Sequence, residues 1–112
     1  MDCLFCKLIR REKPANIVYE DESVFAFTDI KPVAPVHVLL IPKEHFETIA
    51  DVPEGSPLMA VLTDRAVKIA DQLGLSRDGF RLVLNNGDNG GQTVYHLHIH
   101  LLGGRFMTWP PG

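Results

Sequence analysis

The chain has 112 residues, of which 46% are hydrophobic and 22% charged, as expected for one globular domain with its own core. Its formal net charge of −3 argues against a general nucleic-acid surface, so any phosphate site must be built locally from a few groups. Lysines and arginines interrupt the first apolar stretch, which argues against a signal peptide, and no apolar run approaches the ~18 residues of a membrane span. We therefore expect a cytoplasmic protein that binds neither nucleic acid nor membrane.

Two helices are predicted. The first covers residues 4–11 and stops before Pro14, because proline cannot continue a helix. The second begins at Ser56-Pro57, since serine is a good N-cap and proline suits the first helical position, and it ends before Gly74. The apolar residues that recur at helical spacing within it are Leu58, Leu62, Ala66, Ile69 and Leu73.

Strands outnumber helices. The predicted strands cover residues 16–20, 23–29, 36–41, 80–84 and 95–102. All but one of the connections between them lack the long helical crossover that parallel pairing needs, so the sheet should be mainly antiparallel. The fold class is therefore α+β: a five-stranded, mainly antiparallel sheet with one main helix and a short N-terminal helix.

The last predicted strand carries three histidines, His96, His98 and His100, spaced by two residues. A helix would scatter them, whereas a strand places all three on one face. The opposite face then consists of Leu97, Ile99 and Leu101. A row of imidazoles can bind a metal, and it can also bind phosphate or act as a nucleophile. A solvated strand face that merely happens to contain histidine is a poor explanation, because three of the five histidines alternate here.

The two cysteines, Cys3 and Cys6, have the spacing of half a tetrahedral zinc site. Residues so close in sequence make a poor disulfide staple for a domain, which favours a reducing compartment. A thioredoxin-like redox pair is disfavoured because no βαβ unit flanks the motif. Two inert buried thiols remain the other alternative.

Four stretches of the chain resemble one family. Residues 90–105, GGQTVYHLHIHLLGGR, resemble the signature of the histidine triad (HIT) superfamily. The tail 109–112, WPPG, resembles that of the histidine triad nucleotide-binding (HINT) branch. Residues 27–32 match the family's ribose and base pocket, and residues 34–43 match the stretch with its fourth histidine. The resemblance covers essentially the whole chain and implies a single HIT domain, 1–112, whose sheet extends across a homodimer.

The resemblance also implies an activity. A HINT-like protein is expected to hydrolyse purine nucleoside 5′-phosphoramidates, with a purine nucleoside monophosphate as product. By family position His98 is the nucleophile, which attacks the α-phosphorus and forms a nucleotidyl-histidine that water then hydrolyses. His100 and His37 are then donors to phosphate oxygens. His96 is either a further active-site group or a metal ligand.

The same resemblance predicts nucleotide contacts. Asp29 would accept the ribose hydroxyls, although it can also be read as a turn residue. The side chains expected to frame the base, each of which can equally be plain core, are Phe5, Leu8, Phe27, Ile30 and Leu39. The residues expected to approach the phosphate from the glycine-rich loop are Asn85, Gly91, Gln92, Thr93 and Val94. For Asn85 the alternative is ordinary turn chemistry.

A structural zinc ion is the predicted cofactor. Some zinc-bearing HIT proteins combine such a cysteine pair with two histidines, which by resemblance are His45 and His96 here. Zinc at Cys3, Cys6, His45 and His96 would stabilise the fold and take no part in catalysis.

Two other functions compete with the phosphoramidate hydrolase. One is a dinucleoside-polyphosphate hydrolase or nucleotidyl transferase of the same superfamily, whose branches generally lack the tail at 109–112. The other is a non-catalytic regulatory protein that binds zinc or a nucleotide. The intact row of histidines argues against a purely structural role but leaves a regulatory one open.

Overall fold

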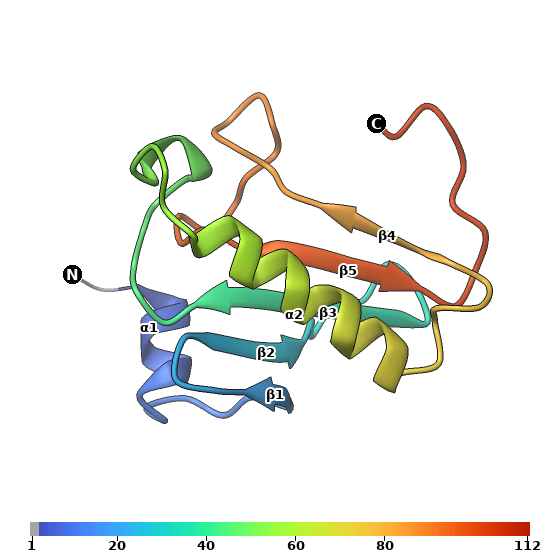
Figure 1. Cartoon of the computed structure of the whole chain (residues 1–112), viewed down its shortest axis with the longest axis horizontal. Coiled ribbons are helices and arrows are strands. Elements are labelled where there is room, and N and C mark those ends of the chain that lie inside the picture. The colour runs from blue at the N-terminus through green and yellow to red at the C-terminus, as the bar shows by residue number, and fades with distance from the viewer. Residues whose placement is uncertain (1–2) are drawn as a thin grey trace.

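The computed structural model describes residues 3–112, and a single five-stranded sheet lies at its centre. The strands are β1 (Ile17–Glu20), β2 (Val24–Thr28), β3 (Val36–Pro42), β4 (Phe80–Val83) and β5 (Ile99–Gly103). Their order is β1-β2-β3-β5-β4, and every neighbouring pair is antiparallel (Figure 1). The predicted α+β class and antiparallel sheet are confirmed.

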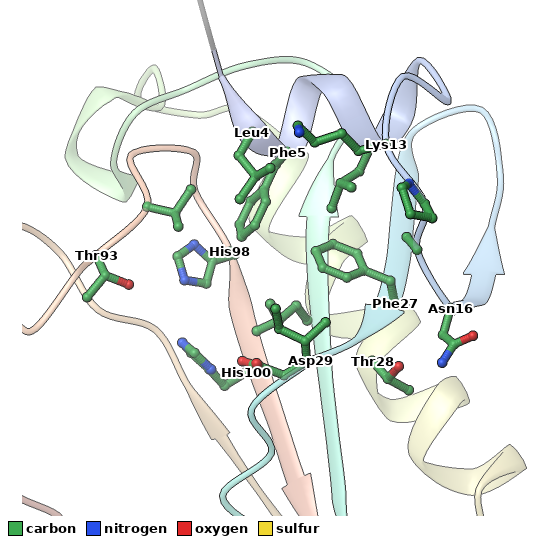
Figure 2. A pocket seen from close by; sticks show the side chains of 16 residues that line it. Leu4, Phe5, Lys13, Asn16, Phe27, Thr28, Asp29, Thr93, His98 and His100 are labelled. Atoms are coloured by element: carbon green, nitrogen blue, oxygen red, sulfur yellow. The ribbon is translucent and has the colours of Figure 1, made fainter.

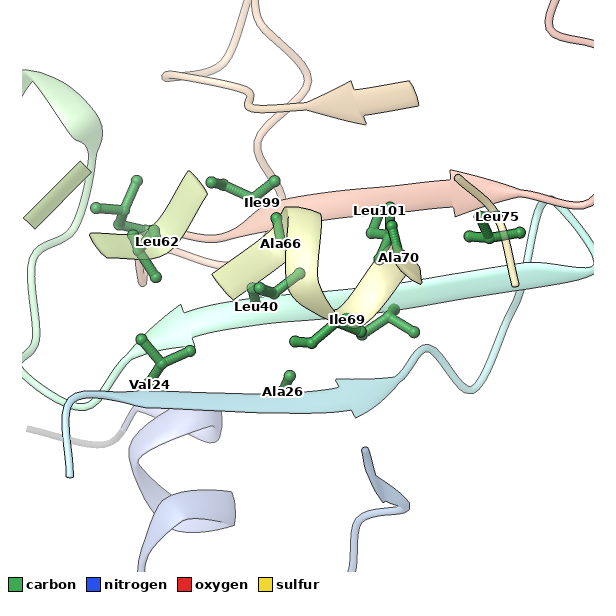
Figure 3. Close-up of a cluster of buried hydrophobic side chains, with 12 residues drawn as sticks. Val24, Ala26, Leu40, Leu62, Ala66, Ile69, Ala70, Leu75, Ile99 and Leu101 are labelled. Carbon is green, nitrogen blue, oxygen red and sulfur yellow. The ribbon is translucent and has the colours of Figure 1, made fainter. Parts of the chain in front are cut away.

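The two α-helices pack on opposite faces of this sheet. Helix α2 (Leu58–Gln72) buries Leu62, Ala66, Ile69 and Ala70 against one face (Figure 3). Helix α1 (Leu4–Ile9) buries Phe5 and Leu8 against the other. Because side chains alternate along a strand, β2 sends Val24 and Ala26 to the first core and Phe25 and Phe27 to the second. A short 3-10 helix, η1 (Ile49–Asp51), was not predicted.

The helix ends follow local chemistry closely. Helix α2 starts one residue later than predicted, with Pro57 as its N-cap, and the Ser56 hydroxyl still accepts a hydrogen bond from Leu58 N, 3.2 Å away. Gly74 follows the helix with φ +76, the left-handed conformation that favours glycine. Helix α1 is shorter than predicted and ends at Ile9, and Arg11 beyond it has φ 65. No helix among residues 3–112 is long and apolar enough to cross a membrane.

The prediction for the last strand was wrong at its start. Strand β5 begins at Ile99, which pairs with Leu40, so His96 and His98 precede the ladder. The ladder cannot continue along β3 because Pro42 has no N–H to donate. The Pro42 carbonyl instead lies 2.8 Å from the His96 side chain, and Leu97 N donates to Phe46 O at 2.7 Å. The burial alternation nevertheless persists, with Leu97 in the α2-side core.

Candidate active site

A cavity of about 540 Å³ lies between helix α1 and the face of the sheet that α1 covers (Figure 2). We call it the α1 cavity. All five side chains predicted to frame a base line it: Phe5, Leu8, Phe27, Ile30 and Leu39. The polar groups at one end are Asp29, Thr93, His98 and His100. An apolar cleft with a few convergent polar groups is the usual form of a small-molecule site.

His98 is held in one protonation form by the backbone. Its Nδ1 lies 2.7 Å from the carbonyl oxygen of His96, which can only accept, so Nδ1 carries the hydrogen. In the neutral ring Nε2 then keeps its lone pair, the form that a nucleophile needs. Burial lowers the pKa of His98, which favours this neutral ring. The Phe5 ring packs edge-on against it, with the two ring centroids 5.3 Å apart.

A chain of hydrogen bonds gives His100 the opposite form. Val33 N donates to Nδ1 of His37 at 3.2 Å, so a neutral His37 carries its hydrogen on Nε2. That Nε2 lies 2.9 Å from Nδ1 of His100 and donates to it. His100 therefore keeps its own hydrogen on Nε2. Burial, with smaller effects from His98 and His37, lowers the pKa of His100 to about 4, and burial also lowers the pKa of His37.

Two imidazoles with complementary roles therefore line the cavity. His98 offers a lone pair, and His100 offers an N–H group. His37, predicted as a phosphate donor, is not among the lining residues and lies behind His100, where it sets the protonation form of that ring.

Asp29 lies at the end of β2 with its carboxylate fixed by two neighbours. Its Oδ1 accepts from Lys31 N at 2.8 Å, and its Oδ2 lies 3.4 Å from Nε2 of His37. The residue lines the cavity, so lone pairs of the carboxylate remain for a ligand hydroxyl.

Only some residues of the predicted phosphate loop line the cavity. Thr93 and Val94 line the cavity, whereas Asn85 and Gly91 do not. The Gln92 amide is buried: its oxygen accepts from Gly87 N at 2.9 Å, and its nitrogen donates to the carbonyls of Glu47 and Val94 at 2.7 and 3.1 Å. Through these bonds Gln92 stabilises the conformation of the loop.

The structure adds a wall that the sequence did not single out. Residues 13–16 follow α1, and all four line the cavity. Pro14 was one signal of this connection, because proline cannot continue a helix, although α1 already ends at Ile9. Apolar periodicity could not reveal which face of the cavity this connection covers.

The side chains of Cys3, Cys6, His45 and His96 converge beside this cavity. Their sulfur and Nδ1 atoms all lie within 4.8 Å of one another, and we call them the Cys/His cluster. Three sulfur–nitrogen distances are 3.3, 3.5 and 3.6 Å, and the two Nδ1 atoms are 3.1 Å apart. Around a tetrahedral zinc ion the corresponding edges are about 3.6 Å and about 3.3 Å, so the arrangement fits such an ion.

The protonation of His96 also suits a metal. Its Nε2 lies 2.8 Å from the Pro42 carbonyl and must donate to it, which leaves the lone pair on Nδ1, inside the cluster. A second grouping, Asp29, His37 and His100, is equally compact but is not suited to a metal. There the Val33 amide occupies Nδ1 of His37, so a hydrogen sits on Nε2 where a lone pair is needed.

The chain is similar to known proteins in both sequence and fold. The HIT-domain family model matches residues 10–107. A HIT-like protein of Synechocystis sp. is 54% identical over 112 residues, covering 99% of this chain and 97% of the relative. The purine nucleoside phosphoramidase of Escherichia coli K12 is 49% identical over 105 residues, covering 93% of this chain and 88% of that protein.

The crystal structure of a HIT family hydrolase from Legionella pneumophila superposes with a TM-score of 0.96 at 55% identity, covering 99% of this chain and all of that one (100%). Fold and site together are those of a small hydrolase with an imidazole-lined cavity. The chain belongs to the HIT family.

Proposed function

We propose that the protein hydrolyses purine nucleoside 5′-phosphoramidates. The observation that carries this proposal is the pair of complementary imidazoles, with a lone pair on His98 and an N–H on His100 at one end of the α1 cavity. The similarity to a purine nucleoside phosphoramidase supports the same reaction.

In the proposed first step, Nε2 of His98 attacks the α-phosphorus and the P–N bond to the leaving amine breaks. The departing nitrogen takes a proton from solvent, and the ring keeps its Nδ1 hydrogen on the His96 carbonyl. His100 donates to a non-bridging oxygen, where negative charge must be stabilised. Water then attacks the nucleotidyl-histidine, the N–P bond breaks, and the nucleoside monophosphate leaves with His98 restored.

The rest of the cavity would hold the nucleoside. Asp29 accepts the ribose hydroxyls through lone pairs that Lys31 N leaves free. The hydroxyl of Thr93 faces the same end of the cavity as His98 and is suited to donate to the phosphate. The purine ring would lie between the side chains of α1 and those of β2 and β3, where apolar contact recognises its shape.

Zinc is the metal we propose for the Cys/His cluster. When bound there, it would join α1 to the segment that carries His98 and would supply a structural cross-link. The chain's own residues prepare the site: Cys3 and Cys6 provide thiolates, and the Pro42 carbonyl orients His96. Two cysteines without a disulfide agree with a reducing, cytoplasmic location.

We also propose a homodimer in which two sheets join edge to edge. Strand β4 is an outer strand of the sheet, and its Leu82 side chain is exposed. Sedimentation equilibrium measures the mass directly, and a monomer at micromolar concentration would contradict this part of the proposal.

The activity is tested by amine release from adenosine and guanosine phosphoramidates, with His98→Ala beside the wild type. We expect release by the wild type only, and trapping of nucleotide on His98 after a denaturing quench at alkaline pH, because acid would cleave the N–P bond. The unfolding midpoint of the variant shows whether its fold is retained. A wild type that hydrolyses dinucleoside polyphosphates but not phosphoramidates, or that binds nucleotides without any turnover, would overturn the proposal.

A further inference from the structure

Away from the imidazoles, the α1 cavity is lined by a lysine that the proposed reaction does not use. Figure 2 shows Asn16 across the cavity from His98 and His100, and the Lys13 side chain beside Phe5 on the α1 side. Both residues belong to the wall formed by residues 13–16, between α1 and β1. The rest of the lining away from the imidazoles is mostly apolar, so these side chains, with Thr28, are the polar groups available there.

A nucleotide in the proposed orientation would bring its base to this wall. With the α-phosphate at His98 and the ribose at Asp29, the base extends away from the imidazoles along the apolar lining, to which Phe5 and Phe27 belong. These two rings contact each other edge to face, with centroids 5.4 Å apart, so they form one apolar surface against the purine, which does not distinguish its substituents. The edge of the base is therefore recognised by polar groups at residues 13–16.

Lys13 and Asn16 differ in what they can recognise. An ammonium group has three donors and no acceptor, whereas a carboxamide has both. The edge of a 6-oxopurine presents two acceptors, O6 and N7, and that of adenine presents a donor, the N6 amino group, beside N7. Lys13 therefore pairs with both atoms of a 6-oxopurine and meets an N–H₂ group in adenine. Asn16 can adapt to either base.

From this placement we infer that Lys13 makes the site selective for 6-oxopurine nucleotides, guanine or hypoxanthine, over adenine nucleotides. The inference rests on the proposed function for the orientation of the nucleotide. Lys13 is exposed at the rim, so water competes with the base, and we expect a selectivity of about fivefold, near the low end for such a pair.

The test is the affinity of the full chain for GMP, IMP and AMP by isothermal titration calorimetry. IMP shares O6 and N7 with GMP but lacks its 2-amino group, so the wild type should bind GMP and IMP alike and AMP about fivefold more weakly. Lys13→Met keeps an unbranched side chain of similar length and removes the ammonium. It should reduce the preference to within about twofold, through weaker binding of GMP and IMP.

Lys68→Met is the matched control. Lys68 is exposed on α2, which covers the other face of the sheet, does not line the cavity, and carries the same charge, so its variant should keep the wild-type preference. Equal binding of AMP and GMP by the wild type, a preference that persists in Lys13→Met, or a preference for GMP with IMP binding like AMP would each overturn the role of Lys13.

These failures are distinct from failure of the proposed function. If guanosine and adenosine phosphoramidates are hydrolysed with equal kcat/KM, the hydrolase stands and the selectivity is refuted. If none of the three nucleotides binds, both are refuted.

Discussion

The buried imidazoles should make the free protein sensitive to mild acid, and His100 provides the measurable case. Its pKa is lowered from 6.5 to about 4 in the folded protein by burial and by the neighbouring rings of His98 and His37. Protonation therefore favours the unfolded chain. The stability that neutral His100 contributes is present above pH 6.5 and is lost as pH falls from there toward 4.

The size of the effect follows from these two values. Linkage at a single site gives a loss of about 2 kcal/mol between pH 7 and pH 5. Because the ring is only partly buried, solvent screening reduces this figure, and we expect about 1 kcal/mol from His100.

The assay is urea unfolding of the wild type and of His100→Gln, at pH 7 and pH 5, in the presence of a fixed metal concentration. Glutamine keeps hydrogen-bonding capacity and cannot titrate. The wild type should lose about 1 kcal/mol more than the variant over this interval. Equal losses would refute the reasoning, because they would show that His100 is not held neutral by its burial.

Three further predictions concern the nucleophile, the cluster and the core. His98→Ala should lower kcat for phosphoramidate hydrolysis by at least about 10³, measured by amine release, and a tenfold loss or less would contradict covalent catalysis. Cys6→Ser should reduce bound zinc, measured by atomic absorption, and lower the unfolding temperature; unchanged metal content would remove Cys6 from the site. Leu62→Ala, at a fully buried position on the sheet-facing side of α2, should destabilise the fold by about 2–5 kcal/mol in urea unfolding, and a loss under 1 kcal/mol would contradict its place in the core.

Much of the fold could be predicted because each element has a strong local signal. The spacing of Leu62, Ala66 and Ile69 defines the buried face of α2, and Ser56 and Gly74 define its ends. The alternation around His98 correctly separates core from cavity. The start of β5 could not be predicted, because it depends on Pro42, a residue that is far away in sequence and lies on the neighbouring strand.

The residues that form the candidate site could be predicted from the sequence better than the contacts between them. The side chains predicted to frame a base line one cavity, and the four members of the Cys/His cluster come together. The sequence could not show that Gln92 bonds to Glu47, 45 positions away, or that His37 lies behind His100. Such contacts depend on which atoms meet after folding, and residue type alone leaves several partners open.

The orientation of His98 has a consequence for how this protein tolerates mutation. In many hydrolases an acidic side chain orients the catalytic imidazole, and one substitution can remove that partner. Here the partner is the main-chain oxygen of residue 96, which every amino acid possesses. Substitution of the His96 side chain therefore leaves the acceptor in place as long as the backbone path is kept. The Nδ1 hydrogen of His98 is thus protected from substitution of the residue that accepts it, and it loses its partner only where the backbone of this segment moves.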